Sequence, residues 1–134
     1  MSGDLIFVYG TLRKDSGSDM SRLLRRCSDF VADATFRGVL YSVGRYPGVT
    51  PSLHADDRVH GEVYRLHDAD RALAILDDYE GCRDSRSGSE YVRRTEAVTL
   101  KSGKNVPAWV YVYARPTAGL ERILSGDYFS HERA

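Results

Sequence analysis

Short strand-like runs separated by turn-forming segments are the feature that most limits what this chain can fold into. The runs are rich in β-branched and aromatic residues and cover residues 5–9, 30–43, 59–66, 91–100 and 106–113. Such runs are typical of β-strands, and few connections are long enough for the crossover helices of a doubly wound parallel sheet. The sequence therefore predicts an α+β fold, a small mixed, largely antiparallel β-barrel flanked by two or three helices.

Apolar residues at helical spacing indicate where those helices lie. Residues 18–26 and 118–124 each predict a short helix. Between them, Asp68 is placed to cap a longer helix over residues 69–80, which Gly81 would close. All of these helices are expected to pack on the outside of the barrel.

The connections carry signals of their own. Residues 44–48 contain Gly and Pro and mark a turn, so we expect a long strand followed by a loop. Residues 101–105 predict a hairpin connection. The polar, Gly- and Ser-containing segment 83–90 follows the helix over 69–80 directly and is expected to form a lid beside whatever site lies there.

Charge and length narrow the class of partner. The chain has 19 basic and 19 acidic residues, so no net field draws it to nucleic acid or to an anionic membrane. A small-molecule ligand is the expected partner. The apolar run over 5–9 is far too short for a membrane span or a signal peptide, which favours a cytoplasmic protein. At 134 residues, we expect one domain over 1–134; the sequence leaves the oligomeric state open.

The cysteines and histidines indicate neither a metal nor a cofactor. Cys27 and Cys82 are the only cysteines, and neither has a second cysteine or a histidine nearby at metal-ligand spacing. The 4 histidines offer no defensible nucleophile pairing or metal spacing either. We therefore expect no disulfide framework and no zinc site.

Glu80 is an acid in an apolar position. With about 100° of rotation per helical residue, Leu73 and Leu76 lie on the apolar face of the helix over 69–80, and Glu80 continues that face while Asp78 points nearly opposite. Burial raises the pKa of a carboxyl group toward neutrality, as a general acid/base requires. The alternative is a helix that ends by residue 79, with Glu80 turned into solvent.

The stretch Tyr9-Gly10-Thr11-Leu12 is the second candidate. A glycine directly after a buried strand lets the following backbone N–H groups converge on an anionic or carbonyl oxygen. An ordinary strand-to-helix turn would look the same. Most tyrosines in strand-like positions are more often core residues than site residues, but Tyr91 is kept as a candidate substrate contact.

These signals occur in an order that resembles the gamma-glutamylcyclotransferase-like family, and more closely its gamma-glutamylamine cyclotransferase and small bacterial branches. The motifs that carry the resemblance are Phe7-Val8-Tyr9-Gly10-Thr11-Leu12-Arg13, Tyr46-Pro47-Gly48, Val59-His60-Gly61-Glu62-Val63-Tyr64, Leu76-Asp77-Asp78-Tyr79-Glu80, Tyr91-Val92-Arg93-Arg94 and Ala108-Trp109-Val110-Tyr111-Val112-Tyr113. Together they run over nearly the whole chain. The resemblance implies a small mixed barrel flanked by helices and assigns catalysis to Glu80.

The resemblance also implies a reaction. In the family, the α-amino group of the substrate attacks its own γ-amide carbonyl, which releases an amine or amino acid and leaves 5-oxoproline, without cofactor or metal. Backbone N–H groups around Gly10, Thr11 and Leu12 would hold the γ-glutamyl moiety. Because some relatives lack the acid, a non-catalytic ligand-binding module of the same fold is the main alternative. A thiol enzyme that uses Cys82 beside Glu80 is a third.

Overall fold

The computed structural model of the chain describes residues 2–10, 19–43, 46–80 and 91–127. Its elements, in chain order, are η1 (Ser2–Asp4, a 3-10 turn), β1 (Leu5–Val8), α1 (Asp19–Arg26), β2 (Ser28–Val43), β3 (Tyr46–Pro51), β4 (Arg58–Leu66), α2 (Ala69–Glu80), β5 (Tyr91–Leu100), β6 (Asn105–Tyr113) and β7 (Glu121–Arg122). The expected lid over 83–90 lies outside the described residues, as do Thr11, Leu12 and Cys82.

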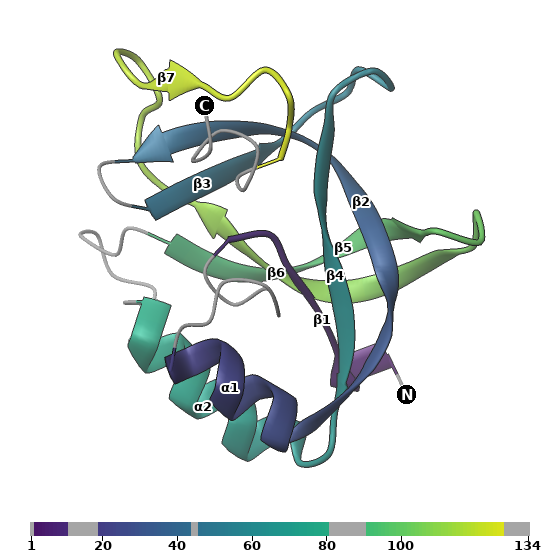
Figure 1. Ribbon diagram of the computed structural model, residues 1–134. Helices are drawn as coiled ribbons and strands as arrows, with labels where there is room; N and C mark the ends of the chain where they lie inside the picture. Colours follow the sequence, from purple (N-terminus) through teal and green to yellow (C-terminus); the bar gives the residue numbers. More distant parts are fainter. Residues whose placement is uncertain (1, 11–18, 44–45, 81–90, 128–134) are drawn as a thin grey trace.

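The strands close into a barrel because the sheet returns to its first strand (Figure 1). β1 pairs with β4, β4 with β2, β2 with β3, β3 with β6, and β6 pairs with β1 again. The two pairings of β6 with β1 and β3 are parallel and the others are antiparallel. β5 runs antiparallel to β6 and also pairs with β2. The predicted mixed, largely antiparallel barrel is confirmed.

The barrel interior is filled by alternate residues of its strands, as the two-residue period of a strand requires. Val59 and Val63 of β4 are fully buried there, and Phe7 of β1 packs against Phe36 of β2 with ring centroids 6.2 Å apart. Each buried side chain of this size contributes roughly 1.5–3 kcal/mol relative to an exposed one. The interior therefore holds the strands together without help from the helices.

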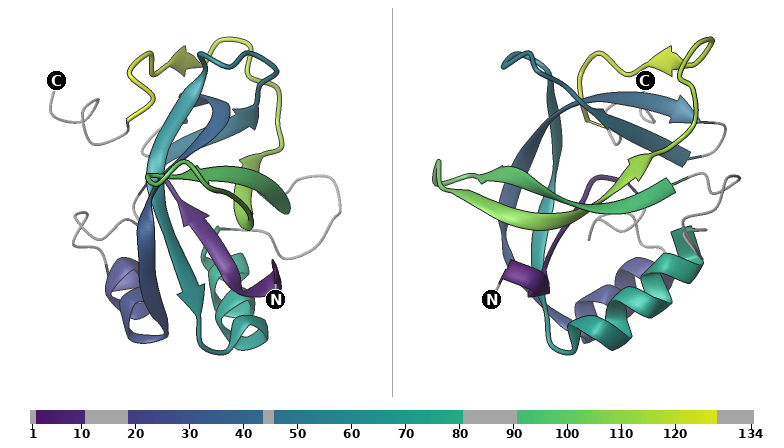
Figure 2. Two further views of the ribbon diagram at one scale, coloured as in Figure 1. Left: turned by 90° about the vertical axis from the view of Figure 1, so that its right-hand side faces the viewer. Right: turned by 180° about the vertical axis from the view of Figure 1, so that it is seen from behind.

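The helices cover a second apolar cluster on the outside of the barrel. Leu24 of α1 and Leu73 and Leu76 of α2 are buried against outward-facing residues of the strands, including Ile6 and Tyr64. Both helices lie at the same end of the barrel (Figure 2). The helical spacing read from the sequence is thus matched by burial on one face, and α2 is held against the wall that β1 and β6 share.

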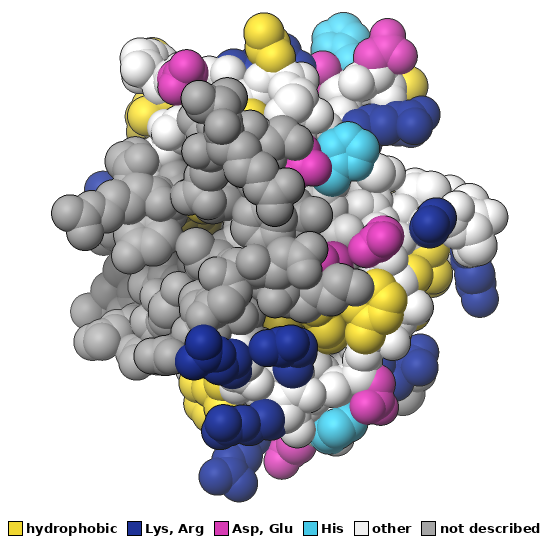
Figure 3. Space-filling model, in the orientation of Figure 1, with side chains coloured by type: hydrophobic (Ala, Val, Ile, Leu, Met, Phe, Trp, Pro, Cys, Tyr) yellow, Lys and Arg dark blue, Asp and Glu magenta, His cyan; other side chains and the backbone are white. Residues whose placement is uncertain are grey.

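The surface carries side chains of both charges (Figure 3). Arg22, Arg25 and Arg26 are exposed on α1, as expected for the solvent face of an amphipathic helix. Among the described residues, no helix has the length and apolar character needed to cross a membrane.

Two sequence-based expectations are wrong. Residues 118–124 do not form a helix: Glu121 and Arg122 pair as β7 with β2, and the buried side chain of Ile123 fills the barrel interior. The expected turn over residues 44–48 gives way at Tyr46 to β3, in which Pro47 lies opposite Ser42. Proline is tolerated near the start of a strand. In both places, pairing with β2 prevails over the local preference of the segment.

Gly61 is a position where the barrel admits no side chain. A Cβ there would collide with the carbonyl oxygen of Val8 and come within 2.7 Å of the Phe7 ring. We therefore expect Gly61→Ala to lower the free energy of unfolding by roughly 1–3 kcal/mol, as overpacking a tight core does. Denaturant unfolding measures this. Gly3→Ala is the control, because nothing lies within 4 Å of a Cβ added there; an equal effect of both changes would contradict the prediction.

Candidate active site

Helix α2 presents its apolar face to the barrel and carries Glu80 at its end. Ala72, Leu73 and Leu76 are between 2% and 5% exposed, so the stripe predicted from the sequence is the face that packs. The helix runs through Glu80, one turn beyond Leu76. The side chains of residues 78–80 lie outside the described part of the structure. The direction of the Glu80 carboxylate therefore stays a prediction.

The other candidate begins where β1 ends. Tyr9 is buried and stacks against Phe7 with ring centroids 6.2 Å apart, and its hydroxyl donates a 2.6 Å hydrogen bond to the carbonyl oxygen of Tyr111. Gly10 is buried too, and a Cβ there would lie 2.6 Å from Cγ of Pro47. The ring of Tyr9 thus belongs to the core, while the Gly10 backbone lies against the start of β3.

Pro47 connects this segment to Tyr91. Its carbonyl oxygen accepts a 2.8 Å hydrogen bond from the Tyr91 hydroxyl, and both residues are buried. Tyr91 also meets Tyr113 edge to face, with ring centroids 5.7 Å apart. The hydroxyl of Tyr91 therefore donates its hydrogen bond to the backbone of β3.

The same contacts extend to α2. Tyr91 and Leu76 belong to one buried cluster on the outside of the barrel. A continuous path of packing therefore leads from Gly10 through Pro47 and Tyr91 to the helical turn that precedes Glu80. Residues 70 positions apart in the sequence are brought to the same side of the barrel in this way. That Glu80 and the loop after Gly10 line one pocket remains a prediction that this path supports.

Sequence reasoning missed an ion pair beside Glu80. Asp77 of α2 accepts hydrogen bonds from Arg93 of β5 at 2.6 and 3.0 Å and from the Tyr111 hydroxyl at 2.8 Å. Asp77 lies on the flank of the apolar stripe, and helical periodicity alone indicates no partner for a residue there. The available signal was that the last turn of α2 contains no basic residue, so its acids need a cation from another element.

A buried acid stands near the end of β1. Glu62 lies opposite Val8 in the β1–β4 pairing and is 1% exposed. The Tyr64 hydroxyl donates a 2.9 Å hydrogen bond to its Oε1. A buried carboxylate requires such partners, and we assign Glu62 a structural place in the β4 wall.

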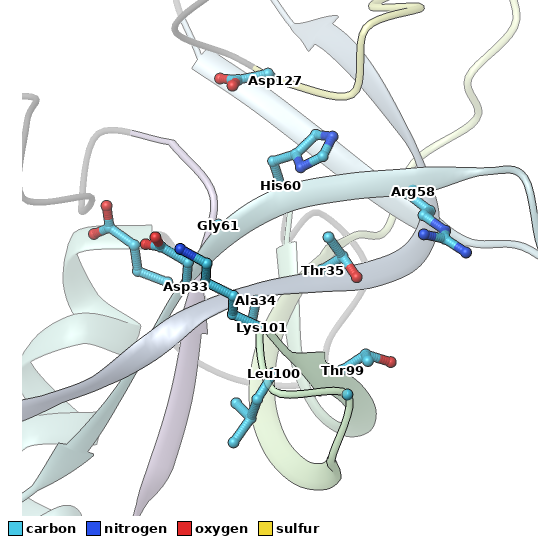
Figure 4. A pocket seen from close by; sticks show the side chains of 12 residues that line it. Asp33, Ala34, Thr35, Arg58, His60, Gly61, Thr99, Leu100, Lys101 and Asp127 are labelled. Atoms are coloured by element: carbon cyan, nitrogen blue, oxygen red, sulfur yellow. The ribbon is translucent and has the colours of Figure 1, made fainter.

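A cavity of about 750 Å³ opens between β2, β4 and the hairpin that joins β5 to β6 (Figure 4). Its walls come from β2, β4 and the β5–β6 hairpin, and its lining includes Asp33, His60, Glu62, Lys101 and Asp127. None of the described residues that line it belongs to α2 or β3. No residue of the path from Gly10 through Pro47 and Tyr91 to Leu76 lines this cavity, so we do not place the site there.

The thiol alternative rests on Cys82, which lies outside the described residues. Cys27 is half-buried, and burial raises the pKa of its thiol. In the described ranges, no group of His, Cys, Asp and Glu side chains could hold a metal ion.

The fold and these contacts define a class of protein: a small mixed barrel with Gly10 after its first strand and a helix packed on its outer face. The model of the family described as "Gamma-glutamyl cyclotransferase, AIG2-like" matches residues 6–130. The chain belongs to this family. It is 39% identical to the gamma-glutamylcyclotransferase family protein YtfP of Escherichia coli K12, over 96% of this chain and 98% of that protein.

Solved structures agree with this assignment. The solution structure of ytfP from Escherichia coli superposes with a TM-score of 0.63 at 36% identity, covering 96% of this chain and 98% of that one. The crystal structure of YkqA from Bacillus subtilis gives a TM-score of 0.72 at 28% identity. This match covers 96% of the present chain but 40% of YkqA, so YkqA is a much longer protein.

Tyr91 offers a test of how the two halves of the site are joined. We expect Tyr91→Phe to lower the free energy of unfolding by roughly 1–3 kcal/mol, because the buried Pro47 carbonyl would lose its 2.8 Å hydrogen bond. Thermal and denaturant unfolding measure the change. Tyr41→Phe is the matched control: Tyr41 is half-buried on β2, and no hydrogen bond of its hydroxyl is found in the described part of the chain. A Tyr91→Phe protein as stable as the wild type would contradict the stabilising role of this hydrogen bond.

Proposed function

We propose that this protein is a gamma-glutamyl cyclotransferase that converts a γ-glutamyl amine or amide into 5-oxoproline and a free amine. Membership of the family supports the reaction class. The observation that carries the proposal for this chain is the path of buried contacts from Gly10 through Pro47 and Tyr91 to the helical turn before Glu80. It supports the proposal that the loop after Gly10 and the acid borne by α2 serve one site.

The proposed reaction needs no partner beyond the substrate itself. The neutral α-amino nitrogen attacks the γ-carbonyl carbon, a C–N bond closes the five-membered ring, and the bond from that carbon to the leaving nitrogen breaks. Glu80 takes the proton from the attacking amine and returns it to the leaving nitrogen. Because attacker and carbonyl share one molecule, the main task of the protein is to hold the glutamyl chain in a folded conformer.

Each remaining site residue has a proposed part in that task. Backbone N–H groups of Gly10, Thr11 and Leu12 would hold the oxygen atoms of the γ-glutamyl moiety. Tyr9 sets the start of the loop through its buried hydrogen bond to Tyr111. Tyr91, whose hydroxyl is held by its hydrogen bond to Pro47, is proposed as a contact of the substrate.

A substrate panel tests the proposal. The protein is incubated separately with γ-glutamyl amines, γ-glutamyl amino acids and glutathione, and 5-oxoproline is measured. Release from at least one class, with the amine in equal amount, is the expected result and names the leaving group. Binding of these compounds without 5-oxoproline would instead indicate a non-catalytic ligand-binding module, and neither binding nor release would end the proposal.

Glu80→Gln tests the role of the acid. Gln keeps the shape of Glu but cannot accept the amine proton, so we expect the rate of 5-oxoproline release to fall on the order of 10²- to 10⁴-fold. Substrate binding should survive. The melting temperature should hold or rise, because removal of a buried charge relieves its desolvation cost.

Asp78→Asn is the control for this experiment, since helical periodicity places Asp78 on the opposite face of α2. It should be nearly silent in both assays. An active Glu80→Gln protein, or an equal loss of activity in Asp78→Asn, would remove Glu80 from its proposed role.

A further inference from the structure

Asp77 is held by two elements of the barrel wall at once. Its two carboxylate oxygens accept hydrogen bonds from Nε and Nη2 of Arg93 at 2.6 and 3.0 Å, and Oδ1 also accepts one from the Tyr111 hydroxyl at 2.8 Å. Both partners of the ion pair are shielded, with 22% and 23% of their side chains exposed. A bidentate ion pair of this kind fixes the orientation of the two side chains as well as their distance. We call Asp77, Arg93 and Tyr111 the helix clamp.

The clamp is anchored on a rigid part of the fold. Arg93 and Tyr111 are direct cross-strand partners in the β5–β6 ladder, and the Arg93 guanidinium lies 4.3 Å from the ring centroid of Trp109. β6 itself pairs with β1, β3 and β5. A displacement of the β6 backbone would therefore disturb several strand pairings at once.

Tyr111 serves both halves of the candidate site. Its hydroxyl donates to Asp77 near the end of α2, while its carbonyl oxygen accepts the 2.6 Å hydrogen bond from Tyr9 at the end of β1. The helix end and the start of the glycine loop are thus positioned from one residue of β6.

The charges of α2 explain why such a clamp is needed. Asp77, Asp78 and Glu80 stand in the last turns of the helix, where the backbone dipole is negative, and no basic residue lies in the last turn. These acids disfavour the helix end by their own repulsion. Arg93 brings the compensating positive charge from another strand, so the last turn is stabilised where it meets the barrel.

We propose that Asp77 is a positioning residue that sets, through Arg93 and Tyr111, where the last turn of α2 holds Glu80. This inference rests on the proposed function. The apolar contacts of Leu76 alone leave the helix free to rotate or slide slightly, because such packing is not directional. A reacting group displaced by about 1 Å can lose on the order of 10²-fold in rate, which is the error the clamp prevents.

Steady-state kinetics of Asp77→Asn measure this role. We expect kcat for 5-oxoproline release to fall roughly 10- to 100-fold with KM within about threefold of the wild type, because the substrate-holding loop is untouched. Tyr111→Phe, which removes one hydrogen bond of the clamp but keeps the carbonyl that Tyr9 uses, should lower kcat by a smaller factor. Asp77→Glu, which keeps the charge, should recover part of the lost kcat.

The chain contains a matched control. Asp57 likewise accepts a 2.6 Å hydrogen bond from an arginine, Arg122, and another of 2.6 Å from a hydroxyl, that of Ser52. These two bonds, that of Ser52 foremost, lower the pKa of Asp57. Asp57 belongs to neither half of the candidate site. Asp57→Asn should keep the wild-type kcat.

The outcomes separate this inference from the proposed function. If the wild type releases 5-oxoproline, an Asp77→Asn protein with kcat within threefold of it, or an equal loss in Asp57→Asn, overturns the positioning role alone. If the wild type is inactive on the whole panel, the proposed function fails. Hydrogen exchange then decides on the clamp: faster exchange of the last-turn amides of α2 in Asp77→Asn, with those of its first turn unchanged, supports it, and unchanged exchange overturns it.

Discussion

The long, bent strand β2 is the constraint on which the rest of the structure depends. Along its 16 residues it pairs with β3, β4, β5 and β7, so it belongs to several parts of the barrel wall at once. A register slip of one residue in β2 would turn Ala34 and Phe36 out of the interior. This multiple pairing also explains why segments with other local preferences, around Pro47 and Glu121, adopt extended conformations beside it.

Closure of the barrel separates two apolar clusters that do different work. The interior cluster makes the wall stiff, and the outer cluster gives α1 and α2 a surface on which to dock. The strands thus do not themselves carry the proposed general acid; they hold the helix that does. Tyr91 and Tyr111 both connect the outer cluster to another element. The ring of each packs in that cluster, and its hydroxyl donates a hydrogen bond to a residue of β3 or α2.

At the end of α2, what an isolated helix favours differs from what the folded protein contains. The acids that crowd it weaken an isolated helix, and the guanidinium of Arg93, whose Nε lies 2.6 Å from Oδ1 of Asp77, compensates part of that charge. Sites of reaction are often places where a locally unfavourable group is held by its surroundings. The proposed site of this family member follows that pattern. Its unfavourable feature is the crowding of acidic side chains at the end of α2, rather than its backbone geometry.

The strand runs, the apolar stripe of α2 and the glycine after β1 could all be predicted from the sequence alone, whereas the place of Glu80 in that stripe stays a prediction. These are local patterns, with periods of two or 3.6 residues, and a short window contains all the information needed. Only the tertiary structure decided that Gly10 lies against Pro47, that Tyr111 accepts a hydrogen bond from a residue 102 positions away, and that Asp77 faces Arg93. Such contacts depend on which strands become neighbours when the barrel closes, and no local period of the chain encodes that choice.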